Sequence, residues 1–562
     1  MGHPLGQYTI VWPIARSRYI DAMTLATIAA ASGEEIVPLD ITRADRSVFH
    51  ALLTARAEFG GKTVALVDGD ERTLTYNDLT QASFALGHAL KKGTRSGDAV
   101  GILLPTSAGA VIAFFALSAY GRVPAMLNFT SGVAGLKSAV RTAQVRRVIT
   151  ARRFLKLAKL EELVSGLRDL VEFVYLEDVR ANLSLTDKIA AVVGRLLPGL
   201  VACRPGEDAP AVFLFTSGTE GEPKAVALSH RNLLSNAEQV RSHLAIYRTD
   251  ILFNPLPTFH SFGLTVGVLM PLMLGIRDVL HPTPLQPHEI MRRIKASGAT
   301  ILLSTDTFIS QYARAGEPGD LSSVRLAVCG AERLREETRA LLVRKQGLEL
   351  LEGYGVTEAS PVIAANQPGA NRHGTVGHLM QGIEARLEPV EGMPNAGRLQ
   401  VKGPNIMLGY VLAGRPGIIQ PPPNGWHDTG DIVSIDEEGF ITIRGRLKRF
   451  AKLGGEIVSL AVVENCASAL WPEHRHASVA VPDSRKGEQI VLVTTCPGAS
   501  RADVLGWAQD HGVPEIAVPR RIVHVDEVPI LGTGKTDYVR VQSLAAERLQ
   551  EQSLYAAASN QN

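Results

Sequence analysis

Cysteine is scarce in this chain, and the few cysteines are placed for neither a disulfide nor a metal. Four occur among 562 residues, far apart, with no CxxC pair and no histidine cluster beside them: Cys203, Cys329, Cys466 and Cys496. We therefore expect no disulfide framework and no structural zinc site. A reducing cytoplasm fits this composition best.

Long apolar runs and a surplus of charge are lacking too. The longest apolar stretches, residues 111–127 and 264–276, are too short or too interrupted to span a bilayer, so no transmembrane segment is expected. Residues 1–20 contain an early proline and no continuous apolar core, unlike a secretory signal. A formal net charge of +2 without a basic run argues against a nucleic-acid partner. These absences indicate a cytoplasmic protein, at most peripheral to the inner face of a membrane.

One segment leaves that peripheral contact open. Residues 181–200 (ANLSLTDKIAAVVGRLLPGL) are amphipathic and weakly basic. Two interpretations fit: a surface helix that packs on a large domain, or a helix that makes transient contact with a membrane or an acyl-chain donor.

What the chain does contain is the composition and alternation of a large α/β enzyme. Its 45% hydrophobic and 20% charged residues are ordinary for a globular protein, and its length is too great for one core. Residues 63–69 and 72–79 predict a hairpin that leads into a helix. Residues 99–105 predict a buried strand, followed by an apolar helix through Tyr120. Such alternation favours an α/β architecture with layered sheets.

Four short segments carry candidate chemistry. In chain order they are TSGTEGEPK (216–224), GYGVTE (353–358), HDTGD (427–431) and GTGK (532–535). Neither the first nor the last is a Walker phosphate loop. Pro223 precedes the lysine of the first, and Pro529 stands where the last would need a glycine.

The first segment suits the binding of a polyphosphate. It follows the apolar run of residues 211–215, which indicates a buried strand. Its hydroxyls can bond phosphate oxygens, its glycines let backbone N–H groups approach closely, and its lysine adds a mobile positive charge. The candidates are Thr216, Ser217, Gly218, Thr219, Glu220, Gly221 and Lys224. The alternative is a Ser- and Gly-rich surface turn.

The second and third segments suit the rest of a nucleotide. Tyr354 offers a flat ring for adenine, and Thr357 offers a hydroxyl for a phosphate oxygen. Glu358 is the candidate Mg²⁺ ligand, because magnesium takes few carboxylates plus phosphate oxygens. Asp431 can accept both hydroxyls of a ribose, and Arg446, fifteen residues later, can bond the same ribose. A turn aspartate and a surface arginine are the alternative.

In this order the four segments resemble the signature set of the adenylate-forming enzymes: acyl-CoA synthetases, peptide-synthetase adenylation domains and luciferases. The resemblance covers roughly residues 45–545. It implies an enzyme that uses ATP and Mg²⁺ to convert a carboxylic acid to acyl-AMP and then passes the acyl group to a thiol. Ala225 departs from the pattern, since the family usually has glycine there, but it lies beyond the phosphate-contacting turn.

The resemblance also implies residue roles. Lys535 would reach the substrate carboxylate and the α-phosphate together and neutralise charge as the two anions meet. His260, in LPTFHSFGLT, would lie between the nucleotide and the acyl pocket and position the carboxylate or gate the pocket; a packed core histidine is the alternative. The candidate catalytic residues are therefore Thr216, His260, Glu358 and Lys535. Further residues implied around the nucleotide are Gly330, Ala331, Glu332, Gly353 and Gly355.

The domain plan follows from the same resemblance. Residues 1–446 would form a large N-terminal adenylation domain of several subdomains, which binds ATP and the acid. Residues 447–562 would form a small, mobile α+β C-terminal lid. Lys448, two residues after Arg446, would be its hinge.

One branch of the family is more similar than the rest. Segments such as NPLPTFHSFGLT and KRFAKLGGEIVSLAVVE resemble the acyl-ACP synthetase half of the bacterial bifunctional 2-acylglycerophosphoethanolamine acyltransferase/acyl-ACP synthetase. None of the fifteen histidines has an aspartate five residues later, so the HxxxxD motif of the acyltransferase half is missing. The branch implies a fatty-acid substrate and acyl carrier protein as the thiol, with coenzyme A as the alternative. An alternative of another class is a non-catalytic acyl-adenylate sensor.

Overall fold

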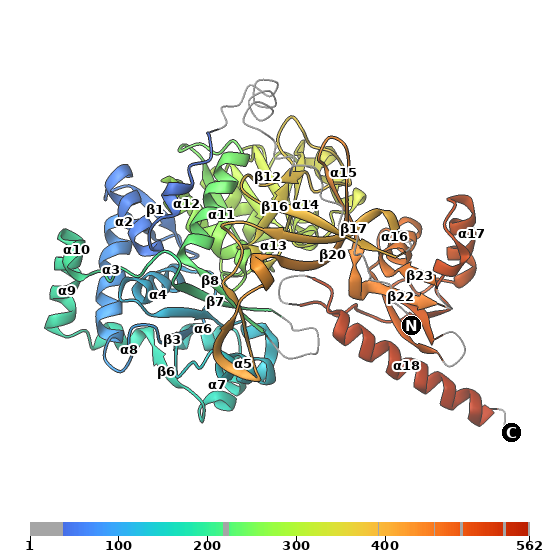
Figure 1. The fold of residues 1–562 in the computed structure, drawn as a ribbon, viewed down its shortest axis with the longest axis horizontal. Coiled ribbons are helices and arrows are strands. Elements are labelled where there is room, and N and C mark those ends of the chain that lie inside the picture. Colours follow the sequence, from blue (N-terminus) through green and yellow to red (C-terminus); the bar gives the residue numbers. More distant parts are fainter. Residues whose placement is uncertain are drawn as a thin grey trace, which may run out of the picture. The chain divides into compact units, whose positions relative to one another are not determined.

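The computed structural model divides into two compact units (Figure 1). Among the described residues, the large unit comprises the chain from Val37 to Ile383 and Lys402–His427, and the small unit comprises Glu384–Val401 and the chain from Asp428 onward. The structure describes residues 37–216, 224–391, 393–453, 456–483, 487–531 and 535–559.

Within its described residues, the large unit holds two mixed sheets. We name them after central strands. The strands of the β9 sheet are, in spatial order, β15 (His378–Leu379), β14 (Val362–Ala365), β13 (Leu350–Gly355), β12 (Leu326–Cys329), β11 (Ile301–Ser304), β9 (Ile251–Asn254), β10 (Arg277–Leu280), β1 (Val64–Val67) and β2 (Thr73–Thr75). The strands of the β7 sheet are β19 (Arg415–Gln420), β18 (Gly409–Leu412), β8 (Lys224–Ser229), β7 (Pro210–Thr216), β4 (Val123–Met126), β3 (Ala99–Ile102), β5 (Arg147–Thr150) and β6 (Glu172–Tyr175).

Helices alternate with these strands, as the α/β pattern predicts. The α-helices of the large unit are α2 (Val48–Phe59), α3 (Tyr76–Leu90), α4 (Ala108–Ala119), α5 (Gly132–Thr142), α6 (Arg152–Leu157), α7 (Glu161–Leu167), α8 (Leu176–Ala181), α9 (Leu185–Leu196), α10 (Pro198–Val201), α11 (His230–His243), α12 (Met270–Leu274), α13 (Pro287–Ser297), α14 (Asp306–Ala315) and α15 (Glu336–Gln346). Its other helices are η1 (Ile41–Ala44), η2 (Phe129–Ser131), the π-helix η3 (Phe262–Leu269), η4 (Thr357–Ala359) and η5 (Pro423–Gly425).

The predicted hairpin and helix at the start of this unit are confirmed. β1 and β2 pair antiparallel, and α3 begins directly after β2. Thr75 and Asp78 close a reciprocal capping box at the start of α3, which explains why the chain changes from strand to helix there. β3 and the apolar α4 follow, also as predicted.

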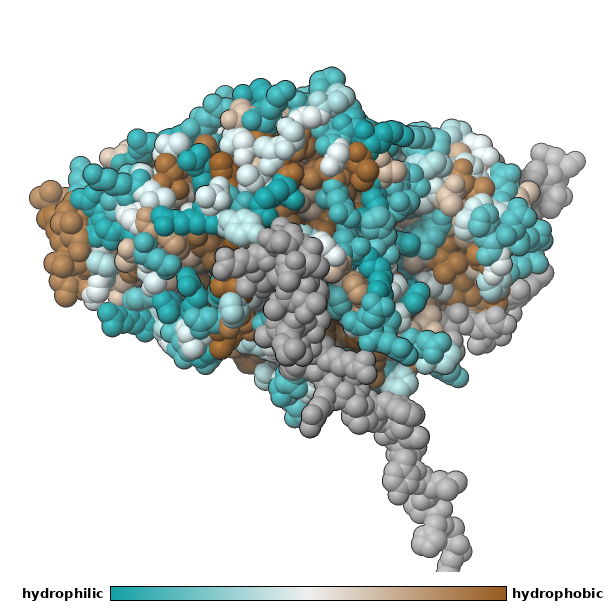
Figure 2. All heavy atoms as spheres, turned by 90° about the horizontal axis from the view of Figure 1, so that it is seen from above, coloured by the Kyte–Doolittle hydropathy of each residue, from teal (hydrophilic) through white to brown (hydrophobic). Residues whose placement is uncertain are grey.

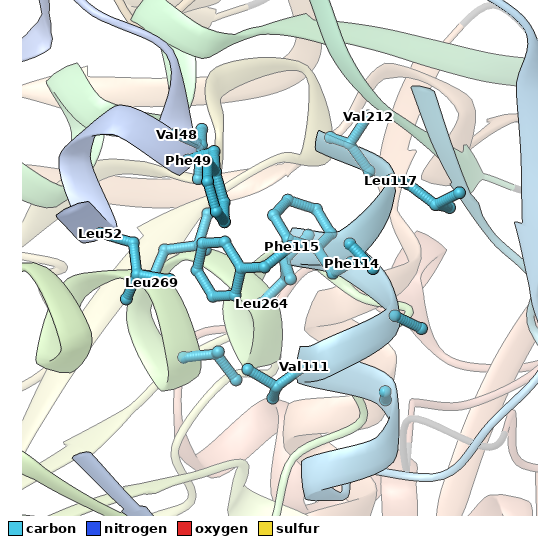
Figure 3. Packing of buried hydrophobic residues seen from close by; sticks show 14 of the residues in the cluster. Val48, Phe49, Leu52, Val111, Phe114, Phe115, Leu117, Val212, Leu264 and Leu269 are labelled. Carbon is cyan, nitrogen blue, oxygen red and sulfur yellow. The ribbon is translucent and has the colours of Figure 1, made fainter. Parts of the chain in front are cut away.

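The core between the sheets is built from the faces of α2, α4 and η3. Figure 3 shows Phe49 of α2, Phe115 of α4 and Leu269 of η3 in one cluster, and each of the three is fully buried. Phe114 and Phe115 pack edge to face, with ring centroids 5.5 Å apart. The apolar run after His260 is helical, as predicted, but its first part has π rather than α geometry, a rare form that is frequent at functional sites.

The small unit contains two further sheets among its described residues. The β20 sheet has the order β16 (Glu384–Val390), β17 (Met393–Lys402), β20 (His427–Ile435) and β21 (Ile441–Arg446). The β25 sheet has the order β23 (Glu456–Ser459), β22 (Phe450–Leu453), β25 (Gly487–Thr494) and β24 (His476–Asp483), with β26 (Arg521–His524) also beside β25. Its helices are η6 (Leu447–Arg449), α16 (Leu460–Leu470), α17 (Arg501–Asp510), η7 (Glu515–Ala517) and α18 (Tyr538–Ser559).

The α/β class with a large unit of layered sheets and a smaller C-terminal unit is thus confirmed. The small unit also includes the β20 sheet, whose strands precede residue 447. The division into domains 1–446 and 447–562 remains a prediction. No helix among the described residues is both long enough and apolar enough to cross a bilayer.

A carboxylic acid is buried in the middle of the β9 sheet. Asp278 of β10 pairs with Leu66 of β1 on one side and Leu252 of β9 on the other, and it is fully buried. Neither of its carboxyl oxygens has a hydrogen-bond partner among the described residues. Burial therefore raises the pKa of Asp278 well above its usual range. The site favours the neutral acid.

We predict that Asp278→Asn stabilises the protein, and more so as the pH rises. The folded protein holds a proton that the unfolded chain releases above about pH 4, so the wild type loses up to about 1.4 kcal/mol per pH unit from there to the folded-state pKa. The asparagine variant escapes this loss. Thermal unfolding at about pH 6 and about pH 8 should show a Tm gap that widens at the higher pH.

The matched control is Asp320→Asn. Lys295 bonds Asp320 and lowers the pKa of that carboxyl, so its charge does not change over this interval. Its Tm gap should be the same at both pH values. An equally constant gap for Asp278→Asn would contradict a buried neutral acid.

Candidate active site

The predicted phosphate segment is the connection of a β-hairpin. Thr216 is the last residue of β7, Lys224 is the first of β8, and the two residues pair across the antiparallel ladder. Both are half-buried. The predicted residues Ser217, Gly218, Thr219, Glu220 and Gly221 lie outside the described residues. Lys224 is thus held at the point where the hairpin opens into the loop.

A phenol connects Lys224 to Glu358. The ammonium group of Lys224 lies 5.0 Å from the ring centroid of Tyr410, within the range of a cation–π interaction. The hydroxyl of Tyr410 donates a hydrogen bond of 2.6 Å to Oε1 of Glu358. We call Lys224, Tyr410 and Glu358 the cation–phenol–carboxylate cluster. It brings together the first and second sequence segments.

Strand pairing explains the position of Tyr410. β18 pairs antiparallel with β8, and Tyr410 is the partner of Val226. Lys224 lies two residues before Val226, so its side chain leaves the same face of the sheet as that of Tyr410. The sequence prediction assigned no role to Tyr410, although it lies in the LGYVLAGRP stretch between the motifs.

The backbone around Glu358 is constrained on both sides. Gly355 ends β13, and a Cβ atom there would come within 2.1 Å of the Pro361 carbonyl oxygen, so only glycine fits. Val356 donates a hydrogen bond to that same carbonyl. After the turn, the carbonyl of Glu358 accepts a 2.8 Å hydrogen bond from Met407 N–H, just before β18. Glu358 is therefore fixed by its backbone and by its side chain.

The cluster fits a magnesium–polyphosphate ligand. Among the described residues neither Lys224 nor Glu358 forms an ion pair, so the phenol separates two charges that stay available. One oxygen of Glu358 accepts from Tyr410, which leaves the other for a metal. No group of three or more His, Cys, Asp or Glu side chains in the described part of the chain can hold a metal on its own. A single carboxylate beside a phosphate-binding lysine suits Mg²⁺, which keeps water and phosphate oxygens as most of its ligands.

The predicted adenine-edge loop follows β12 and borders β13. Gly330 is buried, and a Cβ atom there would lie 3.6 Å from the carbonyl oxygen of Gly353. Ala331 is exposed with φ of 71°, in the left-handed region. Tyr354 is only 8% exposed. The loop residues and the GYG turn are thus neighbours, while their contact with adenine remains a prediction.

Glu332 has a structural contact that the sequence did not predict. Its Oε2 accepts a 2.9 Å hydrogen bond from the backbone N–H of Thr307, in the first turn of α14. The first N–H groups of an α-helix have no intrahelical acceptor, so the carboxylate caps the helix from a distant loop and also interacts favourably with the helix dipole.

His260 precedes η3 in the chain and lies among aromatic side chains. Its ring centroid is 4.9 Å from that of Phe259, which packs edge to face on Phe129 at 5.0 Å. Phe262, at the start of η3, lies beside Gly330, because a Cβ there would be 3.2 Å from the Phe262 ring. The histidine turn therefore adjoins the adenine-edge loop through Phe262. Both interpretations of His260 stay open.

The small unit holds the other candidates. Asp431 of β20 and Arg446 of β21 pair across the ladder, and the Nε atom of Arg446 donates a 2.7 Å bond to Oδ1 of the nearly buried Asp431. Lys535 is exposed, and its carbonyl accepts a 2.7 Å bond from Leu531 N–H. Lys448 lies in η6, directly after β21. The structure therefore joins Asp431 to Arg446, and the roles of all four remain predictions.

We predict that Glu332→Ala lowers the free energy of unfolding by about 1 kcal/mol, because α14 loses its distant cap. Glu332→Gln keeps an acceptor oxygen and should recover most of the loss. Thermal unfolding of both variants measures this difference. Unchanged Tm with weakened ATP binding in Glu332→Ala would instead assign the side chain to the nucleotide.

Comparison with known proteins identifies the family of this chain. Residues 53–411 match the model of the AMP-binding enzyme family. The chain is 28% identical over 491 residues to the medium-chain fatty-acid–CoA ligase of Escherichia coli K12, covering 84% of this chain and 86% of that one. It is 26% identical to the long-chain fatty-acid–CoA ligase of Bacillus subtilis 168, covering 89% and 94%.

Solved structures share the fold. ATP-bound MatB from Rhodopseudomonas palustris superposes with a TM-score of 0.76 at 24% identity, covering 89% of this chain and 99% of that one. The o-succinylbenzoate CoA synthetase MenE of Bacillus subtilis, in complex with its acyl-adenylate, gives 0.74 at 22% identity, covering 86% and 96%. The family match includes the whole β9 sheet, most of the β7 sheet and all three residues of the cation–phenol–carboxylate cluster. This chain belongs to the AMP-binding enzymes.

Proposed function

We propose that the protein is an AMP-forming ligase that joins a fatty acid to the thiol of coenzyme A. The observation that carries the proposal is the cation–phenol–carboxylate cluster, which presents Lys224 and Glu358 side by side without neutralising them. Two relatives named as fatty-acid–CoA ligases, each matched over more than four fifths of this chain, support the choice of acid and thiol.

In the first half-reaction a carboxylate oxygen of the fatty acid attacks the α-phosphorus of ATP, and pyrophosphate leaves. Lys224 binds the polyphosphate, and Glu358, oriented by Tyr410, would hold the Mg²⁺ ion that offsets the phosphate charge. Asp431 and Arg446 bind the ribose. Lys535 neutralises the two anions that meet, which in a site poor in water contributes several kcal/mol, about 100- to 1000-fold in rate.

In the second half-reaction the thiol sulfur, as thiolate, attacks the acyl carbon, and AMP leaves. We expect Lys535 to act in the first step only, because the lid that carries it turns away before the thiol attacks. We propose that the C-terminal lid turns about Lys448 between the steps, since one site must exchange its groups. The turn requires backbone rotation at η6 and not the charge of Lys448.

Two thiol acceptors fit the second half-reaction. Acyl carrier protein is the second candidate, because the segments around His260 and Lys448 resemble the acyl-ACP synthetase branch. Both acceptors present the same phosphopantetheine arm. A non-catalytic acyl-adenylate sensor is less well supported, because such a protein has no need of Lys224, Glu358 and Lys535 together.

The proposal is tested by acyl transfer from one long-chain acid with Mg-ATP to coenzyme A and, separately, to holo acyl carrier protein. We expect AMP to form in step with acyl-CoA, and faster than with the carrier. Faster transfer to the carrier would instead assign the protein to the acyl-ACP synthetase branch. AMP formation without any thioester would contradict both.

Lys535→Ala is the matched variant for that assay. It should abolish acyl-AMP formation, yet transfer from supplied acyl-AMP should be largely intact. Equal loss in both half-reactions would count against the role assigned to Lys535.

We predict that Tyr410→Phe raises the KM for Mg-ATP about tenfold, because Glu358 loses a charge-assisted hydrogen bond that orients it. The ring stays under Lys224, so the cation–π contact survives. Steady-state kinetics at varied Mg-ATP measures the change.

Tyr312→Phe is the control. It also removes one phenol hydrogen bond, 3.0 Å to the Pro284 carbonyl, but from the buried core of the large unit. It should lower Tm and leave KM unchanged. If Tyr410→Phe behaves in the same way, its hydroxyl is structural.

A further inference from the structure

Helices α9 and α10 expose a continuous set of large apolar side chains. Leu185, Ile189, Val192 and Leu196 recur at helical spacing along one face of α9, and Leu197 and Leu200 extend the face into α10. Their exposed fractions are 73%, 51%, 43%, 63%, 57% and 77%. We call these six residues the α9–α10 face. Figure 1 shows both helices at the left edge of the large unit, and Figure 2 shows a hydrophobic group at that edge.

The large apolar side chains of α9 face outward, whereas those of an ordinary surface helix face the core. Its inward face is small or polar: Ala191 and Gly194 are buried, and the buried Asp187 accepts a 2.6 Å bond from His88 of α3. A Cβ atom on Gly194 would come within 2.4 Å of the Phe84 ring, so only glycine lets the helix lie this close. The small and polar residues therefore make the contacts of α9 with the large unit. The large apolar residues stay on the outer surface.

The exposed charges within this segment have one sign. From residue 179 to residue 206 the exposed charged residues are Arg180, Lys188 and Arg204, whereas Arg195 is half-buried and the acidic Asp187 is buried. None of these four cations forms an ion pair among the described residues. Unpaired cations flanking an apolar face complement an anionic bilayer, with apolar groups below the headgroups and cations at the phosphates.

We propose that the α9–α10 face docks the protein on the surface of an anionic phospholipid bilayer. Both interpretations of residues 181–200 are then true at once: the helix packs on the large unit through its small face and leaves its large apolar face for lipid. The proposal rests on the proposed function in one respect, that a long-chain acid dissolves in a bilayer, so docking places the enzyme at its substrate. A second copy of the chain is the other occupant to be tested.

The test is flotation of the full-length protein with vesicles of phosphatidylcholine and with vesicles of equal parts phosphatidylcholine and phosphatidylglycerol, without ATP, acid or thiol. The wild type should bind the anionic vesicles more tightly than the neutral ones. The triple variant Leu185→Ser/Ile189→Ser/Leu196→Ser should bind about tenfold or more weakly to both, because each side chain loses its insertion into the interface.

Two further variants separate the causes. Lys188→Gln/Arg204→Gln should weaken binding to anionic vesicles by about fivefold per charge and leave neutral vesicles unaffected. The control Leu285→Ser/Val343→Ser/Ile418→Ser removes three apolar side chains of similar exposure (63%, 52% and 57%) away from the α9–α10 face, and should bind like wild type.

Three results would overturn the proposal. The first is that the wild type floats with neither kind of vesicle. The second is that the apolar triple and its control lose vesicle affinity to the same extent. The third is that the wild type binds no vesicles and is a dimer in solution, which the apolar triple converts to a monomer. Because no substrate is present, failure here is separate from failure of the ligase reaction. A ligase assay of the apolar triple with a water-soluble acid and no vesicles should match wild type.

Discussion

The hydroxyl of Tyr410 lies where the two sheets of the large unit meet, and the candidate site depends on it. β18 brings Tyr410 beside β8 in the β7 sheet, whereas Glu358 follows β13 of the β9 sheet. The 2.6 Å bond between them therefore crosses from one sheet to the other. The backbone bond from Met407 to Glu358 makes the same crossing. A shift between the sheets would separate the carboxylate from the lysine.

The ring of Tyr410 also keeps Lys224 and Glu358 from forming a direct ion pair. If Lys224 and Glu358 formed a direct ion pair, each would neutralise the other and neither would be available to a ligand. With an aromatic ring between them, the ammonium group faces the ring and the carboxylate accepts from its hydroxyl. Neither group is paired with the other. A ligand that carries both negative oxygens and a divalent cation matches this arrangement.

Sequence patterns predicted what depends on neighbours along the chain. The hairpin before α3, the buried strand before the phosphate segment and the helical run after His260 all follow from local apolar patterns and were confirmed. Tyr410 was not predicted, because its partner is 52 residues away and only strand pairing brings them together. The helix cap by Glu332 was missed for the same reason, since its partner Thr307 is 25 residues earlier.

The amphipathic stretch of residues 181–200 shows a different limit. Its periodicity predicts one apolar face correctly, but periodicity does not say which face turns inward. Steric fit decides that: Gly194 lies against Phe84 where no larger residue has room. The leucines are consequently exposed, which hydropathy alone does not predict.

The most direct test of the central claim is isotope exchange between labelled pyrophosphate and ATP in the absence of any thiol. Reversible attack of a fatty-acid carboxylate on the α-phosphorus returns label to ATP, so exchange should require both the acid and Mg²⁺. Exchange that depends on the fatty acid is the predicted result. Thioester formation without such exchange, accompanied by ADP rather than AMP, would contradict an AMP-forming ligase.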